Sequence, residues 1–456
     1  MPTAPLPRSL RIGYGLGSFC AGTFSTVPGL LLLYYMTNSL GVPAGLAGLA
    51  VFLPKAWDLV VNPVVGRWSD RTVSRMGARR PWLLAGAVVL PPTFVMTFAG
   101  SPVTGATAAL YVGGWFLLAA TAYALFEVPY KAMPAEMTDD YHEQSTLLTW
   151  RMGFLGLAIL LAGGLAPALV NIDGGEPTLG GYRLMAMVIG TVVLLAMVAT
   201  FFGTARAPHI DRAETEHVTV RAQLAAARGN RPFMLLLGLS CAQMLAVGIM
   251  LAGSPYFASY ILEDTGAITT MFLALIGPMI VIMPVWVRVS RRFDKRGGML
   301  AASLLFMIGG MSLSATPAFG EVYAHGCVML TGIGYAGLQL LQFSMLADTL
   351  IYDELRSGKR RAGVFTGLWT AAETVMMAFG ALVLGWILAA SGFVSSQPDE
   401  PVSQPDSAID AILFGGALAP ALLLSIAIAC TLQYDLSAER LNALRKSRDA
   451  TVADPA

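Results

Sequence analysis

Five ionisable side chains stand inside long apolar stretches in the N-terminal part of the sequence. They are Lys55, Asp58, Glu127, Lys131 and Arg151. A charge at membrane depth costs about 2.5–3.5 kcal/mol on insertion scales, and it normally faces a water-filled cavity or an oppositely charged partner. Such side chains are therefore the first candidates for binding an ion or a solute.

Asp58 is the main candidate for binding a cation. The spacing of Lys55, Asp58 and Asn62 places these three side chains on one face of a helix. A carboxylate there can bind Na⁺ together with neighbouring oxygens, or it can take up a proton in a desolvated site. We expect Asp58 to couple an ion, with Asn62 beside it. The alternative is a structural ion pair between Lys55 and Asp58.

A second charged cluster is expected around Glu127. Lys131 follows Glu127 by one helical turn, Pro129 between them loosens the backbone, and Arg151 begins the next apolar stretch. We expect Glu127 to serve both ion coupling and substrate binding, with Lys55, Lys131 and Arg151 as further substrate contacts. A self-neutralising pair of Glu127 and Lys131 is the alternative.

The C-terminal part of the sequence offers fewer candidates. Glu373 is the only acidic residue deep in an apolar stretch there, and no basic residue stands near it. It is the candidate of that half for contact with a substrate or a proton. Tyr256 and Trp369 are candidate aromatic contacts for a substrate, although most aromatic side chains in membrane spans serve packing or interface anchoring.

A short polar segment, residues 66–80, contains one Asp and five Arg. We interpret it as a gate, because neither its Gly spacing nor its Asp is needed to set topology. Arginines that pair across the two halves of the chain would hold the cytoplasmic side closed in one state and separate in the other. The alternative is that these charges only set topology. The predicted gate residues are Gly66, Asp70, Arg71, Arg79, Arg80 and Asp348.

Long apolar stretches must position all of these side chains. The 456-residue sequence is 55% hydrophobic and 12% charged, against roughly 25% charged for soluble proteins. A helix needs about 20 mostly apolar residues to cross a membrane, which predicts an all-α membrane protein and excludes a large soluble core. We expect twelve spans, at 13–36, 44–66, 82–99, 106–131, 146–170, 184–203, 233–260, 267–288, 298–317, 322–348, 364–391 and 409–433.

The basic residues predict the orientation of these spans. Of the 29 Lys and Arg, 25 fall on the side that carries both termini. Because loops rich in Lys and Arg stay on the cytoplasmic side, we expect a multi-pass protein of the cell inner (plasma) membrane with both termini in the cytoplasm.

The spans divide into two related sets of six. The expected parts are an N-terminal six-helix half at 1–203, a cytoplasmic linker at 204–232, a C-terminal six-helix half at 233–434 and a cytoplasmic tail at 435–456. An internal repeat supports this division, because the basic loop after the second span and Glu136 after the fourth are echoed by residues 291–297 and by Asp348. Two related halves around a central site are typical of transporters.

Other function classes find little support. The net charge of +1 gives no case for nucleic-acid binding, and the four Cys show no spacing for a disulfide or a metal site. The four His are dispersed, so no intramembrane enzyme is indicated. We expect no cofactor beyond a coupling ion, a small-molecule substrate and the lipid bilayer as partners, and a monomer. A transport-inactive sensor stays an alternative.

Several short motifs occur in order along the chain. They are Tyr14-Gly15-x-Gly17, Tyr34-Tyr35-x-Thr37, Trp57-Asp58 with Asn62-Pro63, Arg79-Arg80-Pro81-Trp82, Pro129-Tyr130, Arg151, Ala347-Asp348-Thr349 with Tyr352, and residues 363–369. With these motifs the sequence resembles the glycoside-pentoside-hexuronide cation symporter family over nearly its whole length. The resemblance implies the major facilitator fold and cation-coupled symport of a sugar or glycoside-like solute by alternating access.

The resemblance also implies roles for individual residues. Asp58 matches the family's cation-binding Asp, Asn62 falls where sugar symporters have a second Asp, and Glu127 stands for an Asp. Arg151 matches an Arg that contacts sugar, while Lys131 falls where the family has a Trp that stacks on the sugar.

Further departures from the family's residues affect the predicted sugar site and the predicted ion site. Gly22 replaces a sugar-binding Asp, so the familiar galactoside site is not reproduced, and Val61 and Ala124 replace oxygen ligands, which favours H⁺ over Na⁺. A lysolipid or other amphipathic substrate, or proton-driven efflux, stays an alternative.

Overall fold

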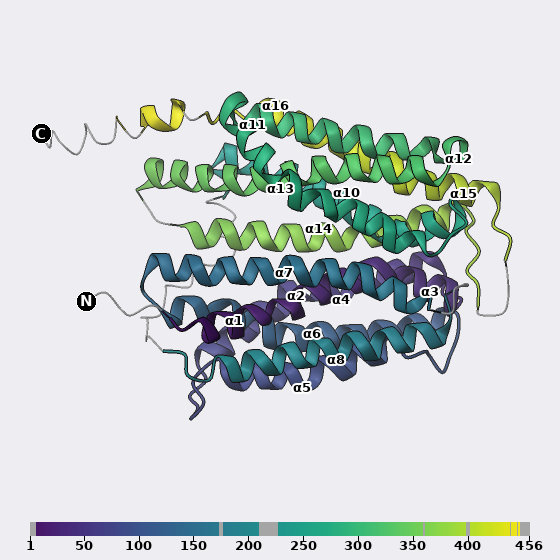
Figure 1. Cartoon of the computed structure of the whole chain (residues 1–456), viewed down its shortest axis with the longest axis horizontal. Helices are drawn as coiled ribbons and strands as arrows, with labels where there is room; N and C mark the ends of the chain where they lie inside the picture. The colour runs from purple at the N-terminus through teal and green to yellow at the C-terminus, as the bar shows by residue number, and fades with distance from the viewer. Residues whose placement is uncertain are drawn as a thin grey trace, which may run out of the picture. The chain divides into compact units, whose positions relative to one another are not determined.

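The computed structural model describes residues 6–172, 177–208, 227–358, 361–397, 402–437, 439–444 and 446. Every regular element in these ranges is a helix, and twelve of the helical segments are long and apolar enough to cross a membrane. The predicted all-α class and the predicted number of spans are therefore confirmed. Figure 1 shows the helices in chain order, from purple to yellow.

The first six spans lie before the predicted linker. Their elements are α1 (Arg8–Leu16), α2 (Ser18–Val27), the π-helical turn η1 (Pro28–Leu32), α3 (Leu33–Ser39), α4 (Ala44–Asp70), α5 (Arg80–Phe98), α6 (Ala106–Met137), α7 (Tyr141–Val170) and α8 (Leu179–Gly203). The first span runs through α1, α2, η1 and α3, over Arg8–Ser39. Its wide turn η1 starts at Pro28, whose missing N–H cannot continue the regular helical bonding.

The last six spans follow the predicted linker. Their elements are α10 (Arg231–Tyr260), α11 (Ala267–Ser312), the 3-10 turn η2 (Leu313–Ala315), α12 (Thr316–Phe319), α13 (Glu321–Ser357), α14 (Ala362–Ala390), α15 (Asp406–Leu413), the π-helical turn η3 (Phe414–Leu418) and α16 (Ala419–Gln433). The eighth span and most of the ninth lie in α11, which breaks at Asp294, where φ is +63°, and the ninth span continues through η2 and α12 to Phe319. The two separate stretches predicted there are thus joined by a sharp turn.

The chain forms two compact units that do not coincide with the predicted halves. Unit 1 contains the described parts of residues 1–214, 251–273 and 381–411, and unit 2 contains those of 215–250, 274–380 and 412–456. The predicted halves follow the order of the chain, whereas these units follow packing. Most of the predicted linker, residues 209–226, and residues 447–456 of the predicted tail lie outside the described residues.

Unit 1 is built around the helices of the first six spans. Within it α5 packs against α6 and α8, α4 packs against α6, and α2 packs against α7, as the darker ribbons of Figure 1 show. Gly13 and Gly203 let α1 and α8 approach closely, because a Cβ at Gly13 would lie 2.7 Å from Cα of Gly203. These contacts hold α4 and α6, which carry the candidate acidic residues, side by side.

Unit 2 has its own hydrophobic core. Phe233 of α10, Phe306 of α11, Met345 of α13 and Trp369 of α14 are all buried in it. A Cβ at Gly334 of α13 would collide with the backbone of Phe306, so glycine at this position allows α11 and α13 to pack closely. This core supports the membrane-depth polar residues of α10, α13 and α14.

Candidate functional site

Glu127 of α6 is the centre of a charged cluster in unit 1. Its Oε1 atom lies 3.1 Å from Lys131 Nζ and 3.3 Å from Arg151 Nη2 of α7. The structure therefore brings together the three residues that the sequence placed in one cluster. Glu127 is only 3% exposed, so its charge is stabilised by these two cations rather than by solvent.

The second carboxylate oxygen of Glu127 has no protein partner. Both cations contact Oε1, while Oε2 is buried without a hydrogen bond, and so is Arg151 Nε. Buried polar atoms in folded proteins nearly always have a partner. An unpartnered acceptor and an unpartnered donor in one cluster suit a site that binds a polar solute or an ion.

Asp58 of α4 is also buried, at 6% exposed, and its Oδ1 atom has no hydrogen-bond partner. In the described part of the chain no ion pair joins Asp58 to Lys55, so the alternative of a structural pair is not seen in this conformation. Asn62, which the helical spacing placed on the same face, is exposed. Asp58 thus keeps an open oxygen where a cation could bind.

Lys55 lies against aromatic rings instead of a carboxylate. Its Nζ atom is 3.9 Å from the ring centroid of Phe24 and 5.5–5.7 Å from those of Phe116 and Tyr123. A cation over such rings is stabilised by the negative face of the π system. This arrangement of three rings from α2 and α6 was not predicted from the sequence, because it depends on how the helices pack.

Tyrosines position the helix that carries Glu127. The Tyr130 hydroxyl donates to the Tyr14 carbonyl oxygen at 2.9 Å and lies 3.0 Å from Ser18 Oγ. The rings of Tyr14 and Tyr130 stack with centroids 4.7 Å apart. These contacts tie α6 to α1 and α2 next to Pro129, so the first span sets the position of the charged cluster.

Arg79 is the centre of the predicted gate segment. Its Nε atom lies 2.7 Å from Glu136 Oε1, and its guanidinium also pairs with Asp70 and bonds to Ser69. Burial alone would lower the pKa of Arg79, but the hydrogen bonds and charges of Glu136 and Asp70 outweigh burial and raise it. Arg79 therefore clamps the end of α4 to the end of α6.

The other predicted gate residues divide between the two units. Arg80 donates to the Phe201 carbonyl oxygen at 3.2 Å, and Arg71 is exposed. In unit 2, Asp348 of α13 pairs with Lys295 at 2.6 Å. The internal repeat seen in the sequence is thus also present in the structure. In each half a basic loop residue pairs with the acid near the end of the fourth or the tenth span. The partners shown here come from the same half, and pairing across the halves stays a prediction.

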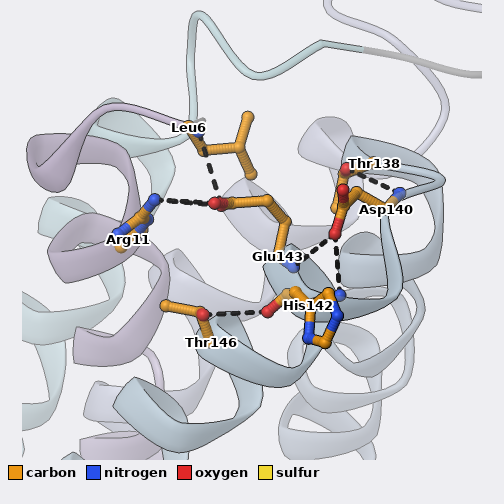
Figure 2. Close-up of polar contacts among 7 residues, drawn as sticks. All are labelled: Leu6, Arg11, Thr138, Asp140, His142, Glu143 and Thr146. Atoms are coloured by element: carbon orange, nitrogen blue, oxygen red, sulfur yellow. Dashed lines mark hydrogen bonds and ion pairs between the residues drawn. The ribbon is translucent and has the colours of Figure 1, made fainter. Parts of the chain in front are cut away.

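A further ion pair joins α1 to α7 (Figure 2). Arg11 Nη2 lies 2.9 Å from Glu143 Oε1, and the Leu6 amide donates to Oε2 at 3.4 Å. Asp140 caps α7 by accepting from the amides of His142 and Glu143. The ion pair was not predicted from the sequence. The cap was predictable, because Asp-x-x-Glu spacing at a helix start is the signal of such a cap.

Glu373 of α14 contacts no cation in the described part of unit 2. The Ser240 hydroxyl of α10 donates to its Oε1 atom at 3.0 Å. Nearby along these helices, the amide of Gln342 donates to Gln243, and both side chains are fully buried. This part of unit 2 thus contains hydroxyl and amide groups together with the partly buried carboxyl group of Glu373.

The two aromatic candidates are enclosed by protein in this conformation. Trp369 is 2% exposed and packs near Phe233, while its Nε1 atom has no hydrogen-bond partner. Tyr256 is fully buried, and its hydroxyl lies 2.6 Å from Thr37 Oγ1 of α3. Neither ring is open to a solute here, so their predicted contact with substrate would require a different state.

Residues 13–438 match the family described as MFS/sugar transport protein. A putative glycoside/cation symporter, YagG of Escherichia coli, is 26% identical, over 86% of this chain and 85% of its own. A putative 2,3-dihydroxypropane-1-sulfonate exporter of the same organism is 26% identical, over 94% of this chain and 93% of its own. These proteins match almost the full set of spans.

Solved structures show the same fold. A bacterial homologue of the human lysosomal transporter Spinster, solved in an inward-facing and unoccupied conformation, aligns with a TM-score of 0.66. It covers 96% of each chain at 15% sequence identity. At this sequence identity the similarity shows the fold alone and does not identify a substrate.

Proposed function

Because the chain belongs to the MFS/sugar transport protein family and is a multi-pass secondary transporter, we propose that it carries a sugar or glycoside-like solute together with a cation by alternating access. The observation that carries this proposal is the pair of buried carboxylates, Asp58 and Glu127, each with one oxygen that lacks a protein partner. An ion or a solute hydroxyl would supply the partner that each of those oxygens lacks.

The coupling ion binds at Asp58 in this proposal, with Asn62 and Glu127 as supporting oxygens. Na⁺ would need several oxygen ligands around it, whereas a proton needs one carboxylate. The residues at 61 and 124 are Val and Ala, which offer no side-chain oxygen. H⁺ is therefore the preferred coupling ion, and Na⁺ is the alternative that the experiment below tests.

The solute binds beside Glu127 and Arg151. Glu127 Oε2 is free to accept from a hydroxyl, and Arg151 Nε is free to donate to one, which is the donor and acceptor pairing that a sugar requires. Lys131, whose side chain is 46% exposed, and Lys55 stand on the same two helices as the acids. The relative named as a putative glycoside/cation symporter supports this substrate class.

Export of an acidic solute is the second candidate function. Lys55, Lys131 and Arg151 outnumber the two buried carboxylates, Asp58 and Glu127, which leaves an excess positive charge at membrane depth. An anionic solute would balance that charge. The relative named as a putative sulfonate exporter supports this candidate.

The sidedness of the molecule is part of the same proposal. Both termini lie in the cytoplasm of an inner-membrane monomer, because the loops rich in Lys and Arg share one side with them. The segment around Asp70 and Arg79 then opens and closes the cytoplasmic side as the two halves rock around the central site.

Transport in proteoliposomes tests the proposal. A panel of labelled glycosides is offered under an imposed proton gradient and, separately, under a sodium gradient, to wild type and to Asp58→Asn. Asp435→Asn is the matched control, because Asp435 is an exposed Asp that pairs with Arg440 outside the spans. We expect gradient-driven accumulation in wild type and in the control, and its loss in Asp58→Asn.

The outcomes separate the candidates. If Asp58→Asn accumulates solute at the wild-type level, Asp58 does not bind the coupling ion. Absence of inward movement under both gradients, together with outward movement of a labelled acidic solute from loaded vesicles, would replace symport by export.

A further inference from the structure

Glu373 is a partly buried acid of α14, inside one of the candidate membrane spans of the C-terminal half. Residues 232–287, 297–355 and 362–439 contain no Lys and no Arg, so the half itself has no basic side chain at comparable depth. In the described part of the chain, the hydrogen bond of good geometry to the Glu373 carboxyl group comes from Ser240, and the indole N–H of Trp369 lies nearby. Glu127, by contrast, is held by two cations.

The titratable groups that face Glu373 carry no charge under ordinary conditions. They are Cys241 of α10 and Tyr335 of α13, whose side-chain types ionise at about pH 8.5 and 10. The remaining polar neighbours, Ser240 and Trp369, are neutral donors. Among the described residues, no element packed against Glu373 therefore supplies a positive charge.

An isolated carboxylate ion is unfavourable in such a place, because Glu373 is partly buried within a membrane span. Removing one from water without a partner costs several kcal/mol, and a single hydrogen bond from a neutral hydroxyl restores only part of that cost. The carboxylic acid form avoids the penalty, because it is neutral. It keeps the Ser240 hydrogen bond at Oε1 and holds its proton at Oε2.

We propose that Glu373 is a proton-binding site of the C-terminal half and that it is occupied in this conformation. The proton leaves Oε2 for water when the site becomes hydrated, leaving the carboxylate, and it returns when the site closes again. Occupancy follows from the charge environment alone, whereas a role in driving transport rests on the proposed function. Glu373 belongs to unit 2, whereas Asp58 belongs to unit 1.

Infrared spectroscopy of the purified protein in lipid tests occupancy without any solute. At neutral pH, wild type should show a carboxylic acid C=O stretching band that Glu373→Gln loses. Glu143→Gln is the matched control, since Glu143 is paired with Arg11 and should contribute no such band. Ser240→Ala should keep the band but shift its frequency, because the hydrogen bond to Oε1 is removed.

Glu373→Asp provides a second variant that keeps an ionisable group, and it should retain the band at a changed frequency. An unchanged band in Glu373→Gln would overturn the proposal, and so would a wild-type protein that shows no acid band. A band lost equally in Glu143→Gln would also overturn it, because the signal would then not belong to Glu373.

The role in transport is tested with a solute found by the uptake panel. Glu373→Gln should lose the accumulation of that solute that a proton gradient drives. Accumulation at the wild-type level would overturn this role even where the infrared band is lost. If the panel reveals no transported solute, the proposed function fails, while the infrared result still decides whether Glu373 holds a proton.

Discussion

Glu127 in the N-terminal half and Glu373 in the C-terminal half have different electrostatic surroundings. In the N-terminal half Glu127 is stabilised by Lys131 and Arg151, whereas in the C-terminal half Glu373 contacts neutral donors and no cation in the described part of the chain. A low-dielectric interior tolerates a carboxyl group when a cation balances it or when a proton neutralises it. The comparison indicates that Glu127 is balanced by cations, and it supports a neutral, protonated Glu373.

Removing the charge of Glu127 is the strongest test of whether its two cationic partners stabilise it. Glu127→Gln leaves Arg151 buried without its anionic partner, and we expect a loss of about 3–5 kcal/mol in the free energy of unfolding. A denaturant titration of the protein in detergent micelles measures it. The double variant Glu127→Gln/Arg151→Gln should recover at least half of the loss. A single variant as stable as wild type would show that the pair contributes nothing.

The ends of the spans offer a second test of charge pairing. Arg79→Gln should cost about 1–3 kcal/mol of unfolding free energy, because Glu136 and Asp70 lose a common partner. The raised pKa of Arg79 means that its contribution is fully present below the ordinary Arg range and fades only at a pH above that range. The same titration at neutral pH measures the loss. Arg71→Gln is the control, since Arg71 is exposed, and equal losses in both variants would contradict the clamp.

Local spacing predicted the parts of the site that lie on one helix. Glu127 and Lys131 are four residues apart, so their pairing follows from helix geometry. The link to Arg151 rested on the order of spans and on the family resemblance. The number of spans was predictable for a similar reason, because apolar length along the chain decides it.

Contacts between distant helices were not predictable in the same way. The aromatic rings around Lys55 come from α2 and α6, and the partner of Arg79 comes from the far end of α6. Trp369 was expected to face a solute, but in this conformation it is enclosed in the core. A single sequence reports which residues are apolar or charged, whereas the side that each one faces depends on the packing of several helices.

Lys131 should matter much less to stability than Arg151, although both contact the same oxygen. The Lys131 side chain is 46% exposed, while that of Arg151 is 13% exposed. Exposed pairs contribute only about 0.2–1 kcal/mol, so Lys131→Met should lower the free energy of unfolding by no more than that. Arg151→Met, measured in parallel, should cost several times as much. A larger loss for Lys131→Met than for Arg151→Met would reverse this assignment.

The smallest effect is expected at Glu373, and it bears most directly on the difference between the halves. Gln has the shape of a protonated Glu and keeps an acceptor for the Ser240 hydroxyl, so Glu373→Gln should change the free energy of unfolding by less than about 0.5 kcal/mol. The same substitution at Glu127 removes a charge that two cations need, while at Glu373 it replaces one neutral group by another. If titration finds equal losses at both positions, Glu373 carries a charge that a partner stabilises, and Glu127 and Glu373 are balanced in the same way.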